Sequence, residues 1–213
     1  MNDEFAREPI PQPGEHLHIN RAHGFQIIQP VGWRVADAAE VRATYDSRNW
    51  RRAEHAPEIP IESMTLPALA LTVGPPDDPL PGNTVLIEVC REPDINWSPL
   101  DQVATAVELA KEWVHFDAQI LETPTPCVSQ GLPAARATLC YTALPVAGGP
   151  ALCRAHFIVH RRGSDLISLA VASVIDGGLS APDKTLERLL GSFRIFHQAG
   201  GPEESVGQGH AAL

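Results

Sequence analysis

Residues 153–173 read CRAHFIVHRRGSDLISLAVAS, and this stretch decides the fold class. Its side chains alternate, so that Cys153, Ala155, Phe157 and Val159 share one face, while Arg154, His156, Ile158 and His160 fall on the other. Alternation with a period of two is typical of a β-strand with one face on a core. We therefore predict strands over 151–161 and 165–173.

The neighbouring sequence extends this β pattern upstream. Strands are predicted at about 118–122 and 134–142, and the second is linked to 151–161 through a turn at Gly148-Gly149-Pro150. The N-terminal half adds predicted strands over 24–29, 68–73 and 83–90 and a weak helix over 36–50; residues 192–196 add a last strand or extended segment.

Two helices carry clear start signals. Ser98 is a good N-cap, Pro99 suits the first helical position, and Asp101 places a negative charge in the first turn. The apolar side chains that follow recur every three or four residues, which predicts a helix packed on one side. A second helix is predicted from Ser180 to Leu190, with Gly191 as its end.

Strands interrupted by helices predict an α+β fold, with a single antiparallel β-sheet and helices packed on its faces. We expect one domain over 23–197 with a long insertion at about 34–66. Residues 1–22 and 198–213 contain few large apolar side chains, and we expect both to be flexible tails because burial cannot offset their ordering entropy.

Composition excludes some function classes. The chain has 213 residues, of which 44% are hydrophobic, and 16 basic against 26 acidic residues give a net charge of −10. A nucleic-acid groove needs clustered Lys and Arg, so this balance argues against one. No leader pattern and no apolar run of about 20 residues is present, which predicts a soluble cytoplasmic protein without a membrane span.

The order of motifs resembles the PsbP-like (Mog/PsbP) superfamily of α/β/α sandwiches, closest to actinobacterial LpqN-like and DcrB-like proteins. The likeness rests on GFQIIQPVGW, LPGNTVLIEV, GLPAARATLCY, the stretch at 153–173 and the terminal SFRIF. The segment 34–66 is longer than this pattern suggests. The resemblance implies accessory, adaptor or ligand-binding work without a shared catalytic triad or cofactor.

The four cysteines, at 90, 127, 140 and 153, form no C-x-x-C pair. A Cys140–Cys153 disulfide is conceivable, but pairing Leu139 and Tyr141 with Ala155 and Cys153 places the two sulfurs on opposite faces. We therefore predict reduced thiols.

Nine histidines are present, yet we predict no metal site and no cofactor. His156 and His160 lie four apart on a strand, at about 13 Å, which is too far to share an ion. His16 and His18 fall in the predicted tail. We interpret the histidines as solvated or satisfied.

No P-loop, nucleophile elbow or dinucleotide motif occurs, so no catalytic residue is predicted. Trp50, Arg51 and Arg52 are the candidate binding residues, because a Trp beside arginines is common in interfaces. A packed Trp with solvated neighbours is the competing interpretation.

Two function hypotheses follow. The first is a non-catalytic binding, adaptor or assembly protein that holds a protein partner or a small apolar ligand. The alternative is a hydrolase or thiol-dependent enzyme whose Cys or Ser meets a His only in three dimensions.

Overall fold

The computed structural model of the chain describes residues 9–46, 66–74, 83–91, 97–111, 117–143, 150–175 and 184–196. Within these ranges the elements are, in chain order, β1 (His16–Asn20), β2 (Phe25–Gln29), β3 (Trp33–Val35), α1 (Ala38–Asp46), β4 (Leu69–Val73), β5 (Thr84–Cys90), α2 (Pro99–Leu109), β6 (Gln119–Ser129), β7 (Leu132–Ala143), β8 (Ala151–Arg162), β9 (Asp165–Val174), α3 (Lys184–Ser192) and β10 (Arg194–Ile195).

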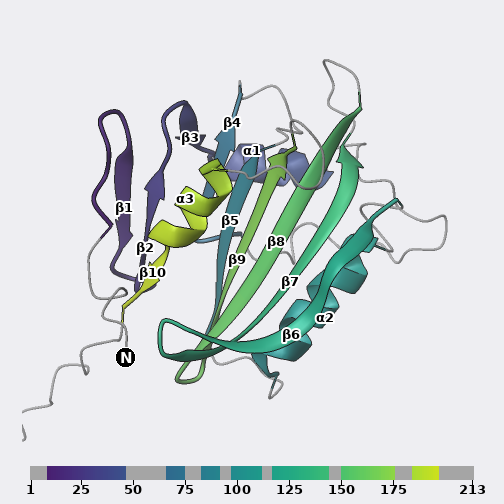
Figure 1. The fold of residues 1–213 in the computed structure, drawn as a ribbon. Helices are drawn as coiled ribbons and strands as arrows, with labels where there is room; N and C mark the ends of the chain where they lie inside the picture. Colours follow the sequence, from purple (N-terminus) through teal and green to yellow (C-terminus); the bar gives the residue numbers. More distant parts are fainter. Residues whose placement is uncertain are drawn as a thin grey trace, which may run out of the picture.

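Seven strands form the larger sheet, in the order β3-β4-β5-β9-β8-β7-β6 (Figure 1). Every neighbouring pair in it is antiparallel. In the β7–β8 pair Tyr141 lies opposite Cys153 and Leu139 opposite Ala155, which confirms the register predicted from side-chain alternation. β7 and β8 are the longest strands, with 12 residues each, whereas β6 extends to Ser129, well beyond the predicted 118–122.

The prediction of a single sheet is wrong, because three strands form a second sheet in the order β1-β2-β10. After β2 the chain turns sharply: the Trp33 amide donates to the Pro30 carbonyl at 3.2 Å, and Gly32 has a φ of +79°. Glycine adopts this left-handed conformation without steric cost. The turn sends β3 into the larger sheet, where it pairs with β4.

The strand β1 also lies inside the segment predicted as a flexible tail. Its five residues, HLHIN, pair with β2 from His16 opposite Gln29 to Asn20 opposite Phe25. The adjacent β2 is buried, since its side chains from Phe25 to Ile28 are at most 2% exposed. It therefore gives β1 a pairing partner that the sequence of β1 itself does not predict. The tail prediction therefore fails for residues 16–20.

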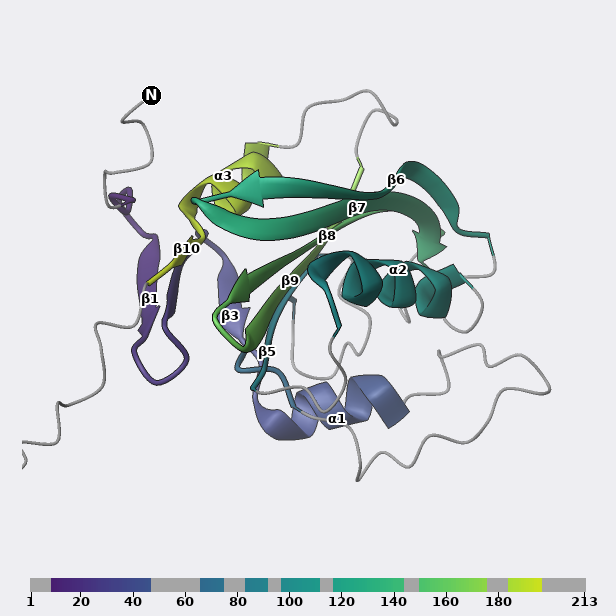
Figure 2. The ribbon, with the colours of Figure 1, turned by 90° about the horizontal axis from the view of Figure 1, so that it is seen from below.

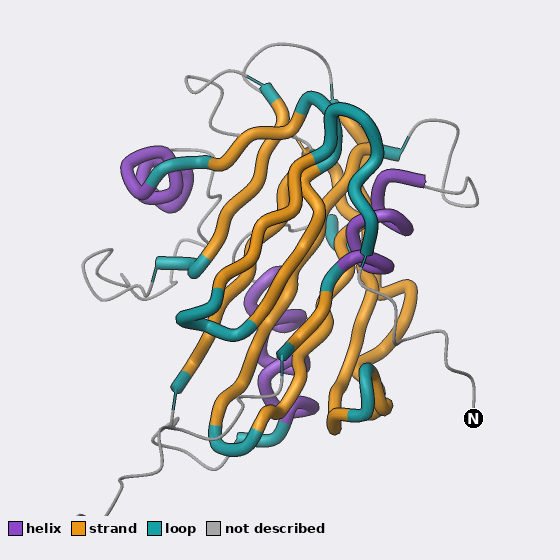
Figure 3. Tube along the Cα trace, turned by 90° about the vertical axis from the view of Figure 1, so that its left-hand side faces the viewer, coloured by secondary structure: helices purple, strands orange, loops and turns teal. Residues whose placement is uncertain are grey.

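Helices cover both faces of the larger sheet. We call the face that carries α3 and the smaller sheet the front face, and the face that carries α1 and α2 the rear face (Figures 1 and 2). Seen edge-on in Figure 3, purple helices lie on both sides of the orange strands. The front core joins Phe25 and Ile27 of β2 and Leu186 and Leu189 of α3 to Val85, Ile87, Ile167, Leu169 and Val171 of the sheet. The rear core joins Val103 and Val107 of α2 to Ala135, Ala137, Leu139, Cys153 and Ala155.

The start of α2 confirms the predicted cap. The Ser98 hydroxyl accepts from the Asp101 amide at 3.2 Å, and the Asp101 carboxylate accepts from the Ser98 amide at 2.9 Å. The Ser98 hydroxyl also donates to the Asp101 carboxylate at 2.6 Å, and this bond, together with the one from the Ser98 amide, holds the pKa of the Asp101 carboxyl below its usual value. Arg161 of β8 donates to the Trp97 carbonyl just before the cap, which fixes this end of α2 to the sheet.

The other two helices differ from prediction at their ends. Residues 47–50 of the first predicted helix and 180–183 at the start of the last lie outside the described residues. Gly191 does not end α3, because the helix continues to Ser192. There the hydroxyl accepts from the Ile28 amide at 3.1 Å and donates to the Leu189 carbonyl at 3.0 Å, so α3 ends bonded to β2. None of the helices in the described ranges is long and apolar enough to span a bilayer.

A buried arginine joins the two sheets. Arg162, at the end of β8, is 8% exposed. Its Nη1 donates to the Gly24 carbonyl at 3.0 Å and to the Phe196 carbonyl at 3.3 Å, and its Nη2 pairs with Asp165 at 3.2 Å. One guanidinium thus binds the start of β2, the end of β10 and the β8–β9 turn.

Replacing Gly24 tests this junction. A Cβ built at Gly24 would lie 2.0 Å from Arg162 Nη1, whereas one at Gly32, which has a similar positive φ, meets nothing within 4 Å. Both Gly24→Ala and Gly32→Ala carry the backbone penalty of about 1 kcal/mol. We expect Gly24→Ala to lose at least about 1–3 kcal/mol more, because it also displaces hydrogen bonds to a buried charge. Equal losses in urea titrations would contradict the proposed role of Arg162.

The front core contains a fully buried histidine. His160 is 0% exposed, and its ring lies 5.8 Å from that of Phe193. Neither ring nitrogen makes a well-aligned hydrogen bond. Burial therefore lowers the pKa of His160 from 6.5 to about 4, with the backbone of Ile167 in β9 acting weakly in the opposite direction. For His160, this corrects the interpretation of the histidines as solvated or satisfied.

The buried neutral imidazole makes stability depend on pH. Below pH 6.5 the unfolded chain binds a proton at this site and the folded chain does not until about pH 4. Stability is therefore intact above pH 6.5 and falls by about 1.4 kcal/mol per pH unit between the two values. We expect His160→Leu to remove this part of the pH dependence. Parallel wild-type and variant profiles in denaturant titrations from pH 7 to pH 4 would contradict it.

Candidate functional site

The predicted contact residues Trp50, Arg51 and Arg52 lie outside the described residues. The flanking elements are described. α1 precedes the segment and β4 follows it, and β4 pairs with β3, the strand just before α1. The long insertion therefore connects two hydrogen-bonded neighbours at one edge of the larger sheet.

The described residues contain a second candidate, on the front face of β6 to β9. On this face, β5 and β9 contribute apolar side chains to the core, whereas β6, β7 and β8 contribute polar side chains. α3 and the smaller sheet lie over the β5 side of this face (Figure 1). We call the following set the polar patch: Glu122, Arg136, Thr138, Arg154, His156 and Ser173.

A hydrogen-bonded row forms the centre of the polar patch. Glu122, Thr138 and His156 lie side by side on β6, β7 and β8. The Thr138 hydroxyl donates to Glu122 Oε2 at 2.9 Å and lies 3.0 Å from His156 Nδ1. A carboxylate can only accept, so the single hydroxyl proton points to Glu122 and Nδ1 must donate to the Thr138 oxygen. The row therefore fixes the tautomer of the imidazole.

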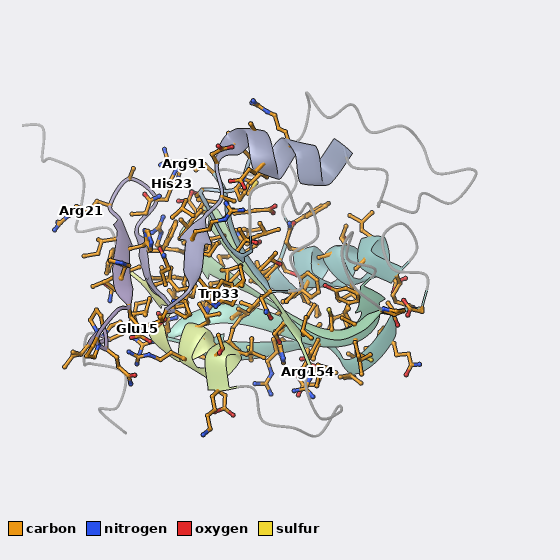
Figure 4. The ribbon with its side chains drawn as sticks, turned by 90° about the horizontal axis from the view of Figure 1, so that it is seen from above. Glu15, Arg21, His23, Trp33, Arg91 and Arg154 are labelled. Atoms are coloured by element: carbon orange, nitrogen blue, oxygen red, sulfur yellow. The ribbon has the colours of Figure 1, made fainter. Side chains whose placement is uncertain are left out.

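Two arginines flank the row on the same face. Arg136 of β7 lies opposite Ile158 and is exposed. Arg154 of β8, labelled in Figure 4, is half-buried and lies opposite Cys140 on one side and Ser173 on the other. Ser173 is 4% exposed, and its hydroxyl makes no hydrogen bond. The patch thus combines two cations, one carboxylate and buried hydroxyls, a set suited to binding polar groups.

In the described strands, the cysteines are paired in register with residues other than histidine. The structure records all four as free thiols. In register, Cys90 lies opposite Leu166, Cys127 opposite Ala134, Cys140 opposite Gln119 and Arg154, and Cys153 opposite Tyr141 and Val174. Cys153 points to the rear face, whereas both histidines of β8 point to the front face. The strand pairing therefore places no thiol directly across from an imidazole.

Metal-ligating groups are also kept apart in the part of the chain that the structure describes, where no three His, Cys, Asp or Glu side chains gather closely enough to hold an ion. His156 and His160 take separate roles on one face, the first in the polar row and the second in the core. The interpretation of His156 as a hydrogen-bonded histidine fits its bond to Thr138.

The polar row is not among the features predicted from the sequence. A signal was present, since Thr138, Cys140 and Thr142 share one face of a strand whose other face is apolar. Such alternation is also that of an ordinary solvent-facing side, although the register predicted for β7 and β8 already implies that His156 lies opposite Thr138. Glu122 was harder to place, because the β6–β7 register shifts on both sides of it.

No protein-family model matches the sequence, and no curated protein matches it. Solved structures do match. The solution structure of cyanobacterial PsbP (CyanoP) from Synechocystis sp. PCC 6803 has a TM-score of 0.47 and 11% identity, covering 88% of this chain and 95% of that one. The Ran-binding protein Mog1p of Saccharomyces cerevisiae has a TM-score of 0.44 and 9% identity, covering 85% and 95%.

A variant of the protein Mog1 also matches, with a TM-score of 0.44, 8% identity and coverage of 86% and 97%. PsbP and Mog1 are the names that the predicted superfamily carries. At TM-scores below 0.5 and identities of this size, such likeness carries no information about function, and the closer likeness to LpqN-like and DcrB-like proteins stays a prediction.

Substituting Thr138 tests the polar row. Thr138→Val keeps the shape of a side chain that is 4% exposed but leaves the Nδ1 proton of His156 without its acceptor. We expect a loss of about 1–3 kcal/mol in the free energy of unfolding. Thr125→Val, on an exposed residue of β6, should change it by less than about 0.5 kcal/mol. If both variants unfold like the wild type in urea, the row contributes nothing to the fold.

Proposed function

We propose that this protein is a non-catalytic binding or adaptor protein that holds a protein partner or a small apolar ligand. The observation that carries the proposal is the direction of the Glu122–Thr138–His156 row. A hydroxyl nucleophile must donate its proton to the imidazole that activates it. Here the hydroxyl proton points to Glu122 and the imidazole donates, so His156 is not placed as a base for Thr138.

Burial supports the same conclusion. Thr138 is 4% exposed, whereas a nucleophile has to reach a substrate atom at about 3 Å. The cysteines do not support the hydrolase or thiol-dependent alternative either. Cys140 and Cys153 are buried, and none of the four cysteines lies across from a histidine in the sheet. Small buried thiols of this kind usually act as core side chains.

The contact surface that we propose for the partner contains Trp50, Arg51 and Arg52. Aromatic and arginine side chains supply much of the binding energy in protein interfaces. We also propose a cytoplasmic location, which the four free thiols support because disulfides are rare in reducing compartments. The proposed relationship to LpqN-like and DcrB-like proteins would place the chain among binding proteins without a shared active site.

Affinity capture with a matched variant tests the proposal. The tagged protein and the triple variant Trp50→Ala, Arg51→Ala, Arg52→Ala are used to capture material from a lysate of the source organism, and both fractions are quantified by mass spectrometry. We expect a protein or apolar compound to be enriched with the wild type and to fall about tenfold or more with the variant.

The control variant is Arg42→Ala, which removes an exposed arginine of α1, the helix that precedes residues 50–52 in the sequence. It should retain the enriched material. Equal recovery with the triple variant would place the contact elsewhere. Turnover of the captured compound that depends on Thr138 or on a cysteine would overturn the non-catalytic proposal itself.

A further inference from the structure

The edges of the two sheets differ in how they are protected. An edge strand offers unpaired amides and carbonyls, and proteins guard such edges with charges, prolines, irregular register or short length. At the edges of the larger sheet, β3 has three residues and carries Arg34, and β6 carries Glu122, two prolines and two register shifts. Both edges of the larger sheet are thus protected against pairing.

In the smaller sheet, β10 is also protected. It has two residues, and the Gln130 side chain covers its outer edge by accepting from the Ile195 amide at 2.9 Å and donating to the Phe193 carbonyl at 3.1 Å. Gln130 does this from a left-handed backbone, with a φ of +53° in the β6–β7 turn. The Gln130 side chain thus satisfies the outward backbone groups of this edge, at the cost of a strained backbone, and closes the edge to another strand.

The remaining edge strand of the described residues, β1, has none of these features. Its five residues, HLHIN, pair with β2 in unbroken register and include no proline and no Asp, Glu, Lys or Arg. Ile19 is 47% exposed, which is high for an isoleucine in a strand. In Figure 4 the labels of Glu15 and Arg21 mark the two ends of β1, at the outer margin of the ribbon.

The direction of the unpaired backbone groups follows from β2. The Gly24 carbonyl accepts from the Phe196 amide, and the Ile28 amide donates to Ser192, so these even-numbered residues point to the β10 side. In an antiparallel strand the backbone groups alternate in direction. The backbone groups of Phe25, Ile27 and Gln29 therefore point to β1. They bond to the backbone of the residues opposite them, which are Asn20, His18 and His16.

The backbone groups of the two intervening residues of β1, Leu17 and Ile19, consequently point away from β2. We propose that this edge pairs with the same edge of a second copy of the chain, antiparallel about a twofold axis at His18. Leu17 of each copy then lies opposite Ile19 of the other, and their amides and carbonyls form four hydrogen bonds. The result is one continuous sheet of six strands, β10-β2-β1-β1-β2-β10.

The sequence of β1 favours a second copy over an unrelated strand because it is complementary to itself in this register. Apolar Leu17 meets apolar Ile19, His16 meets Asn20, and His18 meets His18. Isologous contacts of this kind are the commonest in homo-oligomers. Each copy carries a net charge of −10, and β1 adds no Asp or Glu to the repulsion between the two copies.

Sedimentation velocity over a wide range of concentration tests the proposal on the full chain. We expect a monomer–dimer equilibrium for the wild type. Leu17→Pro removes an outward amide from each copy while leaving the bonds to β2, and should raise the dimer dissociation constant about tenfold or more. Ile19→Lys, at an exposed side chain, should abolish the dimer even if the proline variant fails to fold. Val128→Lys, on the protected β6 edge at 78% exposure, should leave the dissociation constant unchanged.

Amide hydrogen exchange identifies the surface. The amides of Leu17 and Ile19 should become protected as the concentration rises, whereas those of His18 and Asn20 should be protected at every concentration. A wild type that stays monomeric throughout, or that pairs only with an extended segment of another protein, overturns the proposal. So does a dimer that persists in Ile19→Lys with the Leu17 and Ile19 amides exchanging freely.

Discussion

The fold depends on the bonds that Arg162 makes at the end of β8. A buried guanidinium needs all its donors matched, since an unpaired buried charge costs several kcal/mol. Arg162 finds its partners in Asp165, at the β8–β9 turn, and in the carbonyls of Gly24 and Phe196, which are neighbours at one end of the smaller sheet. Near the same junction, Phe25 and Phe193 pack against each other and against the front face of the larger sheet. Because the contacts are directional, they fix how the smaller sheet sits on the larger one, which hydrophobic packing alone would leave loosely specified.

The front face of the larger sheet divides into two parts with different work. Its β5 and β9 side is apolar and is covered by α3 and β2, while its β6 to β8 side carries the polar patch. Between these parts, His160 is buried without a charge. His156, four residues away on the same face of β8, is held in one tautomer by Thr138 and Glu122. Two histidines four residues apart on β8 thus meet opposite environments, because the core ends between them. In this row the hydroxyl proton points to the carboxylate and away from the imidazole, which supports our proposal of binding over catalysis.

Side chains and prolines protect the edge strands of the sheets against pairing with other strands. Gln130 adopts a left-handed backbone in the β6–β7 turn and closes β10, and the prolines of β6 remove donors where a neighbour would otherwise pair. β1 is the exception within the described residues, and an exception of this kind is informative, since an uncharged and regular edge persists only where pairing is harmless or useful.

Local pattern determined much of this protein. Alternation fixed the β7–β8 register, including the opposite faces of Cys140 and Cys153, and Ser98 with Asp101 fixed the start of α2, because both signals act between residues near in sequence or directly opposed. Tertiary structure alone decided the second sheet, since the HLHIN strand becomes stable only against the buried β2 and the Gly32 turn can send the next strand either way. It also decided the Glu122–Thr138–His156 row. Side chains from three strands meet there only after the irregular β6–β7 register is set, and no spacing along the chain records a register that shifts.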